Sequence, residues 1–183
     1  MPSPVAHALA GVAAGWLIGP APQGASRARV VGRAAAFVGA ALAPDLDLLV
    51  GDHSGPTHGL GAAVLVGALV WALVWIVRAA GPPRRDAARL ACATAVAYGS
   101  HTLLDWLGSD SSPPIGVMAL WPLSREYYES SLHVFMAISR RYWLPGFWTY
   151  NLRALARELL ILGPLFVVVM GVRWKLTRRR AES

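Results

Sequence analysis

The sequence predicts an all-α, polytopic membrane helical bundle with about five hydrophobic helices, and three observations lead to that prediction. Apolar residues make up 55% of the 183 residues. Charged residues make up only 15%, whereas a soluble domain has about 25%. The mean hydropathy of +0.45 indicates more apolar surface than a soluble domain of this size can bury. With one cysteine, Cys92, an intrachain disulfide scaffold is excluded.

Runs without acidic or basic residues locate the five expected helices, within a single integral membrane domain spanning residues 1–183. These runs are Val5–Gly19, Ala34–Ala43, Gly59–Val77, Leu90–Leu104 and Leu159–Val172. A bilayer crossing needs about 20 apolar residues, which only the third run approaches; the others need flanking residues, tilt or shielding by neighbours. The first run lacks the positive flank of a signal peptide, so we expect it to be retained. The long loop, residues 108–153, is expected to contain interfacial helices.

The arginines predict the orientation of the chain. The net charge of +7 would suggest nucleic acid in a soluble protein, but in a membrane protein it indicates loops that face anionic lipid. We therefore expect no nucleic-acid partner. The loops after the first and third runs and the basic tail, residues 173–183, are rich in arginine, whereas residues 44–58 have no basic residue. The positive-inside rule then predicts a multi-pass protein of the cell membrane with a cytoplasmic C-terminus. Residues 44–58 and the long loop would face outward.

Histidine and aspartate residues gather on that outward face. Four separate stretches deliver them: first His7; second Asp45 and Asp47; third Asp52, His53 and His58; and fourth His101 and Asp105. The loops predicted to lie in the cytoplasm contain no histidine. This sorting predicts a polar site at one end of the bundle.

Two of the spacings suit a metal ion. His101 and Asp105 are four residues apart, so both project from one helix face. The alternative is a plain His–Asp hydrogen bond, but ionisable residues in a membrane helix are functional candidates by default. In Pro44-Asp45-Leu46-Asp47, one carboxylate can bind a metal while the other orients a histidine. Alternatively, Asp47 caps a helix.

The remaining histidines complete the candidate site. His58 follows Gly55-Pro56 at the start of a helix, whereas His53 is equally well explained as an exposed loop residue. His7 is either a ligand or a polar residue at the membrane interface, and we expect its ring close to Asp105, directly or across a metal. Nitrogen and oxygen ligands without thiolate suit zinc, manganese, iron or magnesium, and the number of histidines favours zinc. A metal with an open position activates water for hydrolysis.

The order of these motifs resembles a known family. His7, Pro44-Asp45-Leu46-Asp47, His53 to Thr57-His58, Ser100-His101-Thr102-Leu103-Leu104-Asp105 and Leu120-Trp121-Pro122-Leu123 look like the YdjM-like membrane-bound metal-dependent hydrolases. The resemblance covers roughly residues 5–124. The chain departs from the family pattern at Ser54, where arginine is usual, and at Gly59, where serine is usual. The first departure would remove a cation that contacts phosphate.

The motif order is also similar, more remotely, to the zinc-dependent phospholipase C and nuclease superfamily. That resemblance implies one metal site made of Asp45, His58, His101 and Asp105, and a second begun by His7 with Asp105. The superfamily's later His-x-x-x-Glu pair is missing, so a site with three metals is not expected. The resemblance implies hydrolysis of a phosphoester.

The expected function is therefore a membrane-embedded metal-dependent hydrolase of a lipid or other phosphoester, using a metal-activated water. Its metal ligands would be His7, Asp45, His58, His101 and Asp105, with His7 also a proton carrier and Asp47 and His53 supporting catalysis. Arg125 either holds a phosphate or snorkels from the interface. The aromatic residues Trp143, Phe147, Trp148 and Tyr150 form a lid or, more simply, an interfacial anchor. The alternatives are a metal or proton transporter, whose ionisable residues should spread through the membrane depth, and a non-catalytic protein with a structural metal.

Overall fold

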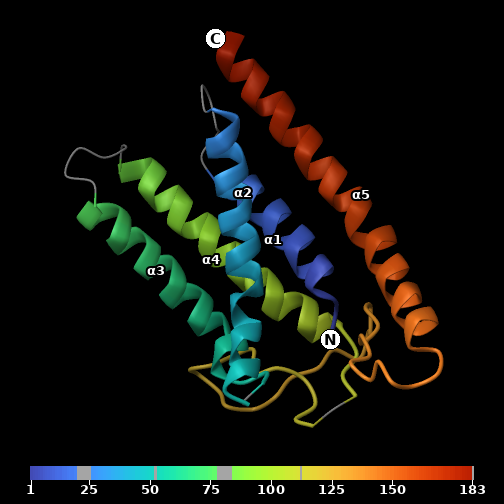
Figure 1. Cartoon of the computed structure of the whole chain (residues 1–183). Helices are drawn as coiled ribbons and strands as arrows, with labels where there is room; N and C mark the ends of the chain where they lie inside the picture. Colours follow the sequence, from blue (N-terminus) through green and yellow to red (C-terminus); the bar gives the residue numbers. More distant parts are fainter. Residues whose placement is uncertain (20–25, 52, 78–83, 112, 183) are drawn as a thin grey trace.

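The computed structural model describes residues 1–183 except 20–25, 52, 78–83, 112 and 183. Its α-helices are α1 (Pro4–Ile18), α2 (Arg27–Leu42), α3 (Leu60–Val77), α4 (Arg84–Leu107) and α5 (Phe147–Glu182), and two short 3-10 helices, η1 (Ala43–Leu49) and η2 (Pro56–His58), lie between α2 and α3 (Figure 1). In the described ranges the chain forms no β-strand, only isolated bridges. The predicted all-α class is confirmed.

Helix α1 is the centre of the bundle. It packs against α2, α4 and α5, while α3 packs against α4 on the far side (Figure 1). Small residues make these close contacts: a side chain at Gly11 would collide with Ala41 of α2, and one at Gly15 would collide with the Phe37 ring. Glycine therefore sets the distance between α1 and α2.

Two apolar clusters hold the helices together. One joins Trp16 and Phe37 to Ala93 and Ala97 of α4, and the two aromatic rings meet edge to face with centroids 6.2 Å apart. The second lies nearer the other end of the bundle and consists of Ala6, Leu104, Phe135 and Leu162. Alanine supplies much of both clusters, so the helices approach closely and their polar side chains at the bundle end come within contact distance.

The prediction of about five hydrophobic spanning helices is wrong in number. Within the described residues, two helices are long and apolar enough to cross a membrane: α3 over Leu60–Val77 and α5 over Phe147–Leu176. Helix α1 has 15 residues, a length of about 22 Å against a hydrocarbon core of about 30 Å. Helix α2 has 16 residues and starts with arginines at positions 27, 29 and 33. The charge-free runs lie within helices, but α1 is too short and α2 begins with too many arginines to count as spanning.

The prediction of interfacial helices in the long loop is also wrong. In the described part of residues 108–146 the chain forms turns and single bridges, Gly108 with Phe135 and Val117 with Tyr128, and no helix. Its backbone groups bond to the bundle end instead, as in the bond from the Ser130 N–H to the Trp106 carbonyl of α4, 2.8 Å long. Proline residues, which lack a donor, further disfavour helix here. Helix α5 begins at Phe147 and takes up the end of the predicted loop.

The Trp-Pro motif has a structural role in this segment. The carbonyls of Ala119 and Trp121 accept the N–H groups of Leu60 and Gly61, at 2.9 Å each. These are among the first N–H groups of α3, which have no partner within the helix. The loop therefore caps α3 and closes the bundle end on which the histidines lie.

The close contact between α1 and α2 predicts a contrast between two glycines. We expect Gly11→Ala to lower the free energy of unfolding by about 1–3 kcal/mol through overpacking, because the new Cβ would collide with Ala41 and lie 3.0 Å from the Phe37 carbonyl oxygen. Gly39→Ala is the matched control on α2, since a Cβ there meets nothing within 4 Å, and it should be neutral or stabilising. Thermal unfolding of both variants in detergent measures the difference. Equal melting temperatures for the two variants would refute the role of Gly11.

Candidate metal centre

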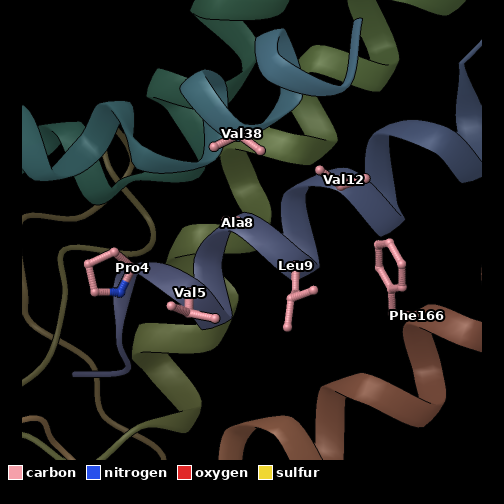
Figure 2. A pocket seen from close by; sticks show the side chains of 7 residues that line it. All are labelled: Pro4, Val5, Ala8, Leu9, Val12, Val38 and Phe166. Carbon is pink, nitrogen blue, oxygen red and sulfur yellow. The ribbon is translucent and has the colours of Figure 1, made fainter. Parts of the chain in front are cut away.

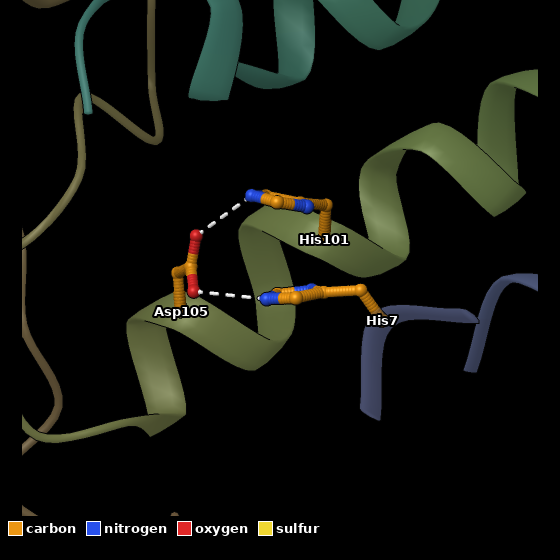
Figure 3. A group of neighbouring side chains, drawn as sticks. All are labelled: His7, His101 and Asp105. Carbon is orange, nitrogen blue, oxygen red and sulfur yellow. Dashed lines mark ion pairs between the residues drawn. The ribbon is translucent and has the colours of Figure 1, made fainter. Parts of the chain in front are cut away.

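The Asp105 carboxylate lies at the centre of the candidate site. It is 3% exposed and faces imidazole rings from three other positions in the chain. Its Oδ2 atom lies 2.9 Å from His101 Nε2 and 3.6 Å from His58 Nε2, and its Oδ1 atom lies 3.4 Å from His7 Nε2. Figure 3 shows the carboxylate of α4 between the His101 ring of the same helix and the His7 ring of α1. The expected proximity of His7 to Asp105 is confirmed.

The His101 ring is held in one tautomer by the end of α2. Its Nδ1 atom lies 2.7 Å from the Ala41 carbonyl oxygen, which can only accept, so Nδ1 carries the proton and Nε2 has the lone pair. The ring stacks on His7, with centroids 3.8 Å apart and an interplanar angle of 18°. The lone pair of His101 is therefore aimed at the carboxylates of Asp105 and Asp45.

Asp47 orients the two histidines that follow η1. Its Oδ2 atom lies 3.1 Å from His58 Nδ1 and accepts a hydrogen bond of 2.7 Å from the Thr57 hydroxyl. Its Oδ1 atom lies 2.9 Å from His53 Nδ1. A carboxylate that holds Nδ1 leaves Nε2 as the ligand atom, an arrangement common among metal-binding histidines. His58 Nε2 accordingly points inward, and the His58 ring is fully buried.

Asp45 is the most exposed of the predicted ligands. Its side chain is 27% exposed, and its Oδ1 atom lies 3.5 Å from His101 Nε2 and 3.7 Å from His58 Nε2. Partial burial alone would raise the pKa of Asp45, but the neighbouring rings of His58, His101 and His7 outweigh burial and hold the pKa below its usual value. Asp45 is therefore a carboxylate at neutral pH, as a metal ligand must be.

Several buried atoms of this cluster have no hydrogen-bond partner. They are His7 Nδ1, His58 Nε2, His101 Nε2 and both oxygens of Asp105. Buried polar atoms are nearly always bonded, and lone pairs that face one another repel. A cation between the His58, His101 and Asp105 atoms removes both problems for those three residues. Two groups of residues each have ligand atoms that all lie within 4.8 Å of one another. The first group is His7, His101 and Asp105, and the second is Asp45, His53 and His58. The residues present therefore fit a divalent metal ion.

The structure thus brings together seven predicted site residues, namely His7, Asp45, Asp47, His53, His58, His101 and Asp105. Arg125 is different: its side chain is exposed, and it does not line the cavity that reaches the cluster. Its predicted contact with phosphate gains no support from this geometry. Asp52 lies outside the described residues.

A polar cavity of about 820 Å³ connects the cluster to the surface. His7, Asp45 and His53 lie on its wall, and Arg140 and Arg141 line it from the long loop. The two arginines were not among the predicted site residues. No motif in the sequence marks these two arginines. The turn that brings them back over the helix ends cannot be predicted from the periodicity of hydrophobic residues.

Glu158 was also missed. It is fully buried on α5 and accepts the Ser3 N–H at 2.7 Å as well as a bond from the Ser3 hydroxyl. Ser3 caps α1 by accepting from the Ala6 N–H, and His7 lies one turn further along. The sequence does carry a signal here, because an acidic residue directly before the apolar run of α5 needs a partner.

The two departures from the family pattern have local explanations. Ser54 is buried with a φ of +69°, and its carbonyl accepts the Met118 N–H at 3.0 Å. At Gly59, an added Cβ would lie 2.8 Å from the Trp121 Cβ and 3.1 Å from the Met118 carbonyl oxygen. The Trp-Pro segment packs too closely on η2 for a side chain at position 59.

Comparison with known proteins supports the motif-based resemblance. The model of the YdjM inner membrane protein family matches residues 1–180. The chain belongs to this family. The YdjM match includes residues 125–180, which the motifs did not anchor, and it supports a membrane location together with α3 and α5. No curated protein and no solved structure matches the chain significantly.

The arrangement predicts which YdjM-family residues bind metal in this chain. We expect His101→Ala and Asp105→Ala each to lose most of the bound metal while the protein still inserts, because both offer inward-facing atoms without a hydrogen-bond partner. Asp47→Asn should weaken binding by about 10–100-fold, the usual effect of losing a carboxylate that orients a ligand. Elemental analysis of the purified variants measures the metal content.

The matched control is His133→Ala, since His133 has a side chain 50% exposed and pairs with Glu129 outside the cluster. It should keep the metal content of the unchanged protein. Unchanged metal in both His101→Ala and Asp105→Ala would remove the metal site.

Proposed function

We propose that this protein is a membrane-embedded hydrolase that uses a divalent metal ion to cleave a phosphoester. The observation that carries the proposal is the convergence of buried nitrogen and oxygen atoms without a hydrogen-bond partner, beside a cavity that His7, Asp45 and two arginines line. Cation ligands and guanidinium groups on the same cavity suit an anionic substrate. The family supports the membrane location.

The proposed ligands are Asp45, His58, His101 and Asp105. His7, which lies next to the other oxygen of Asp105, is a further proposed ligand. Zinc is the preferred ion because the set is rich in histidine, and manganese or magnesium are alternatives. A bound ion of this kind supplies a Lewis acid that lowers the pKa of water and polarises the ester. The protein's own contribution is a set of ligands already in position.

The remaining residues have distinct tasks in this proposal. Asp47 fixes the rings of His53 and His58 through their Nδ1 atoms. His53 lies on the cavity wall, within reach of a proton leaving or entering the substrate. Arg140 and Arg141 lie across the same cavity, where they balance the negative charge of a phosphate group.

The position of the cluster favours an interfacial substrate. His7, η1, η2 and the end of α4 meet at the end of the bundle near the N-terminus, whereas the C-terminus lies at the opposite end (Figure 1). Ionisable groups of a transporter should instead line a path through the bundle. Because the arginines at the starts of α2 and α4 lie at the C-terminal end, the positive-inside rule supports a cluster on the extracytoplasmic face.

A structural metal site is the second candidate, and the burial of the cluster favours it. His7, His58, His101 and Asp105 are each at most 3% exposed, and structural sites use four protein ligands with no open position. Asp45, which is partly exposed on the cavity, distinguishes the two functions. A structural site predicts loss of stability on metal removal with no hydrolysis before or after.

The hydrolase proposal predicts metal-dependent release of product. Purified protein with zinc, manganese or magnesium should hydrolyse at least one of p-nitrophenyl phosphate, bis(p-nitrophenyl) phosphate and phosphatidate. Chelation should abolish this activity. Asp45→Ala should reduce kcat by about 100-fold or more, since the ligand at the open side is lost, whereas His133→Ala should keep full activity. No turnover of any substrate with any of the three metals would reject the hydrolase and leave the structural site.

The sidedness of the cluster can be tested separately. In a Cys92→Ser background, Val50→Cys places a thiol next to η1 at a residue 80% exposed, and Lys175→Cys places one near the C-terminus. A membrane-impermeant maleimide should label position 50 in intact spheroplasts and position 175 only after permeabilisation. The opposite pattern would place the cluster in the cytoplasm.

A further inference from the structure

An apolar groove along α1 lies next to the polar cavity. The groove has a volume of about 390 Å³ and is lined by five residues of α1 between Pro4 and Val12, with Val38 of α2 and Phe166 of α5. Figure 2 shows α1 between Val38 on one side and Phe166 on the other. Pro4 lines both the groove and the polar cavity, so the two spaces lie next to each other at the first turn of α1.

The groove opens sideways from the bundle. Its α1 residues, Pro4, Val5, Ala8, Leu9 and Val12, follow the helical spacing of a single stripe. Among the described residues, α2 and α5 both contact α1 but not each other. The stripe therefore forms a floor between two helices that do not close over it, and Val5 remains 46% exposed. From Pro4 to Val12 the floor is about 12 Å long.

The chemistry changes sharply between the groove and the cavity. Every residue that lines the groove is apolar, so a polar ligand would lose its hydrogen bonds to water there. The neighbouring cavity, by contrast, is lined by His7 and Asp45 of the metal cluster and by the exposed residues Arg140 and Arg141. A single molecule that fits both spaces has a hydrocarbon chain at one end and a phosphate at the other.

We propose that the substrate is a lipid phosphomonoester, with its phosphate in the polar cavity and one hydrocarbon chain in the groove over α1. The inference rests on the proposed hydrolase function for its chemistry, while the binding mode rests on the two adjacent spaces. A phosphomonoester carries up to two negative charges, which the two arginines and a metal ion balance. Hydrolysis adds water across the phosphorus–oxygen bond: phosphorus gains the water oxygen, and the lipid oxygen leaves as an alcohol that takes a proton.

Lateral access explains why the groove is open between α2 and α5. A lipid in the bilayer already has its chain at the depth of the apolar helices, and it reaches α1 without leaving the membrane. Because the chain moves from one apolar surrounding to another, the stripe of Val5, Ala8 and Leu9 positions the lipid rather than removing its chain from water. His7 lies next to Ala8 on α1, so the same helix presents the chain-binding stripe and a proposed metal ligand.

Substitutions that fill the groove test the binding mode. Val38→Trp and Val12→Trp fill it from α2 and from α1, and neither residue lines the polar cavity. Val64→Trp is the matched control, because Val64 is 67% exposed on α3 and lines neither space. The protein is purified in lipid nanodiscs with zinc, and circular dichroism and melting temperature show that each variant is folded.

Two measurements are made on each protein. The first is kcat/KM for phosphate release from dioleoyl phosphatidate and from glycerol 3-phosphate, which share the phosphomonoester but differ in their chains. The unchanged protein should favour phosphatidate by at least about tenfold, because the groove holds its chain and thereby orients the phosphate at the cluster. Val38→Trp and Val12→Trp should lose about tenfold on phosphatidate but not on glycerol 3-phosphate. Val64→Trp should match the unchanged protein on both.

The second measurement is photocrosslinking with a phosphatidate that carries a diazirine in its chain. Crosslinks should fall on the groove residues and should disappear in the two tryptophan variants. Crosslinks in the groove without turnover of either substrate would keep the lipid site and reject the hydrolase. Equal turnover of both substrates, with crosslinks elsewhere or unaffected by the groove variants, would keep the hydrolase and overturn the lipid site.

Discussion

The buried carboxylate of Asp105 is the constraint on which this bundle end depends. A carboxylate removed from water costs several kcal/mol unless opposite charge or donors surround it. Here the surrounding groups come from three separate elements: His7 from α1, His58 from η2 and His101 from the same helix as the aspartate. Each of those rings must be held in place in turn, and much of the local structure does so. Ala41 at the end of α2 holds His101, and Asp47 of η1 holds His58. The chain between α2 and α3 is therefore shaped by the need to surround one charge.

The candidate site could be predicted from the sequence because its signals are local. The spacing of His101 and Asp105 fixes their common helix face, and the proline before Asp45 and the one before Thr57 mark the two short turns. The absence of histidine from the arginine-rich loops indicated that these groups share one end of the bundle. The motif order then connected residues that lie far apart in the chain. What the motifs could not give was the pairing within the cluster, such as Asp47 holding two rings at once, because that depends on how η1 and η2 fold onto each other.

The number of spanning helices could not be predicted in the same way. Charge-free runs give the position of a helix but not the length over which it stays apolar. Helix α2 contains an apolar run yet starts with arginines, and α1 is too short to cross alone. The conformation of the long loop was also predicted wrongly, because its aromatic residues suggest interfacial helices. Its conformation is decided instead by hydrogen bonds to distant helix ends, including the Trp121 carbonyl that caps α3.

The hydrogen bonds between Ser3 and Glu158 join the first and the last helix of the chain. The two residues are separated by 155 positions, and their contact holds the first turn of α1, on which His7 lies, against α5. During synthesis, α1 to α4 can insert and pack before Glu158 has left the ribosome. His7 is then on a helix whose cap has no partner, next to a carboxylate that already needs it. The anchor on α5 therefore comes last, and until it forms, the first turn of α1, next to His7, lacks the partner that Glu158 supplies.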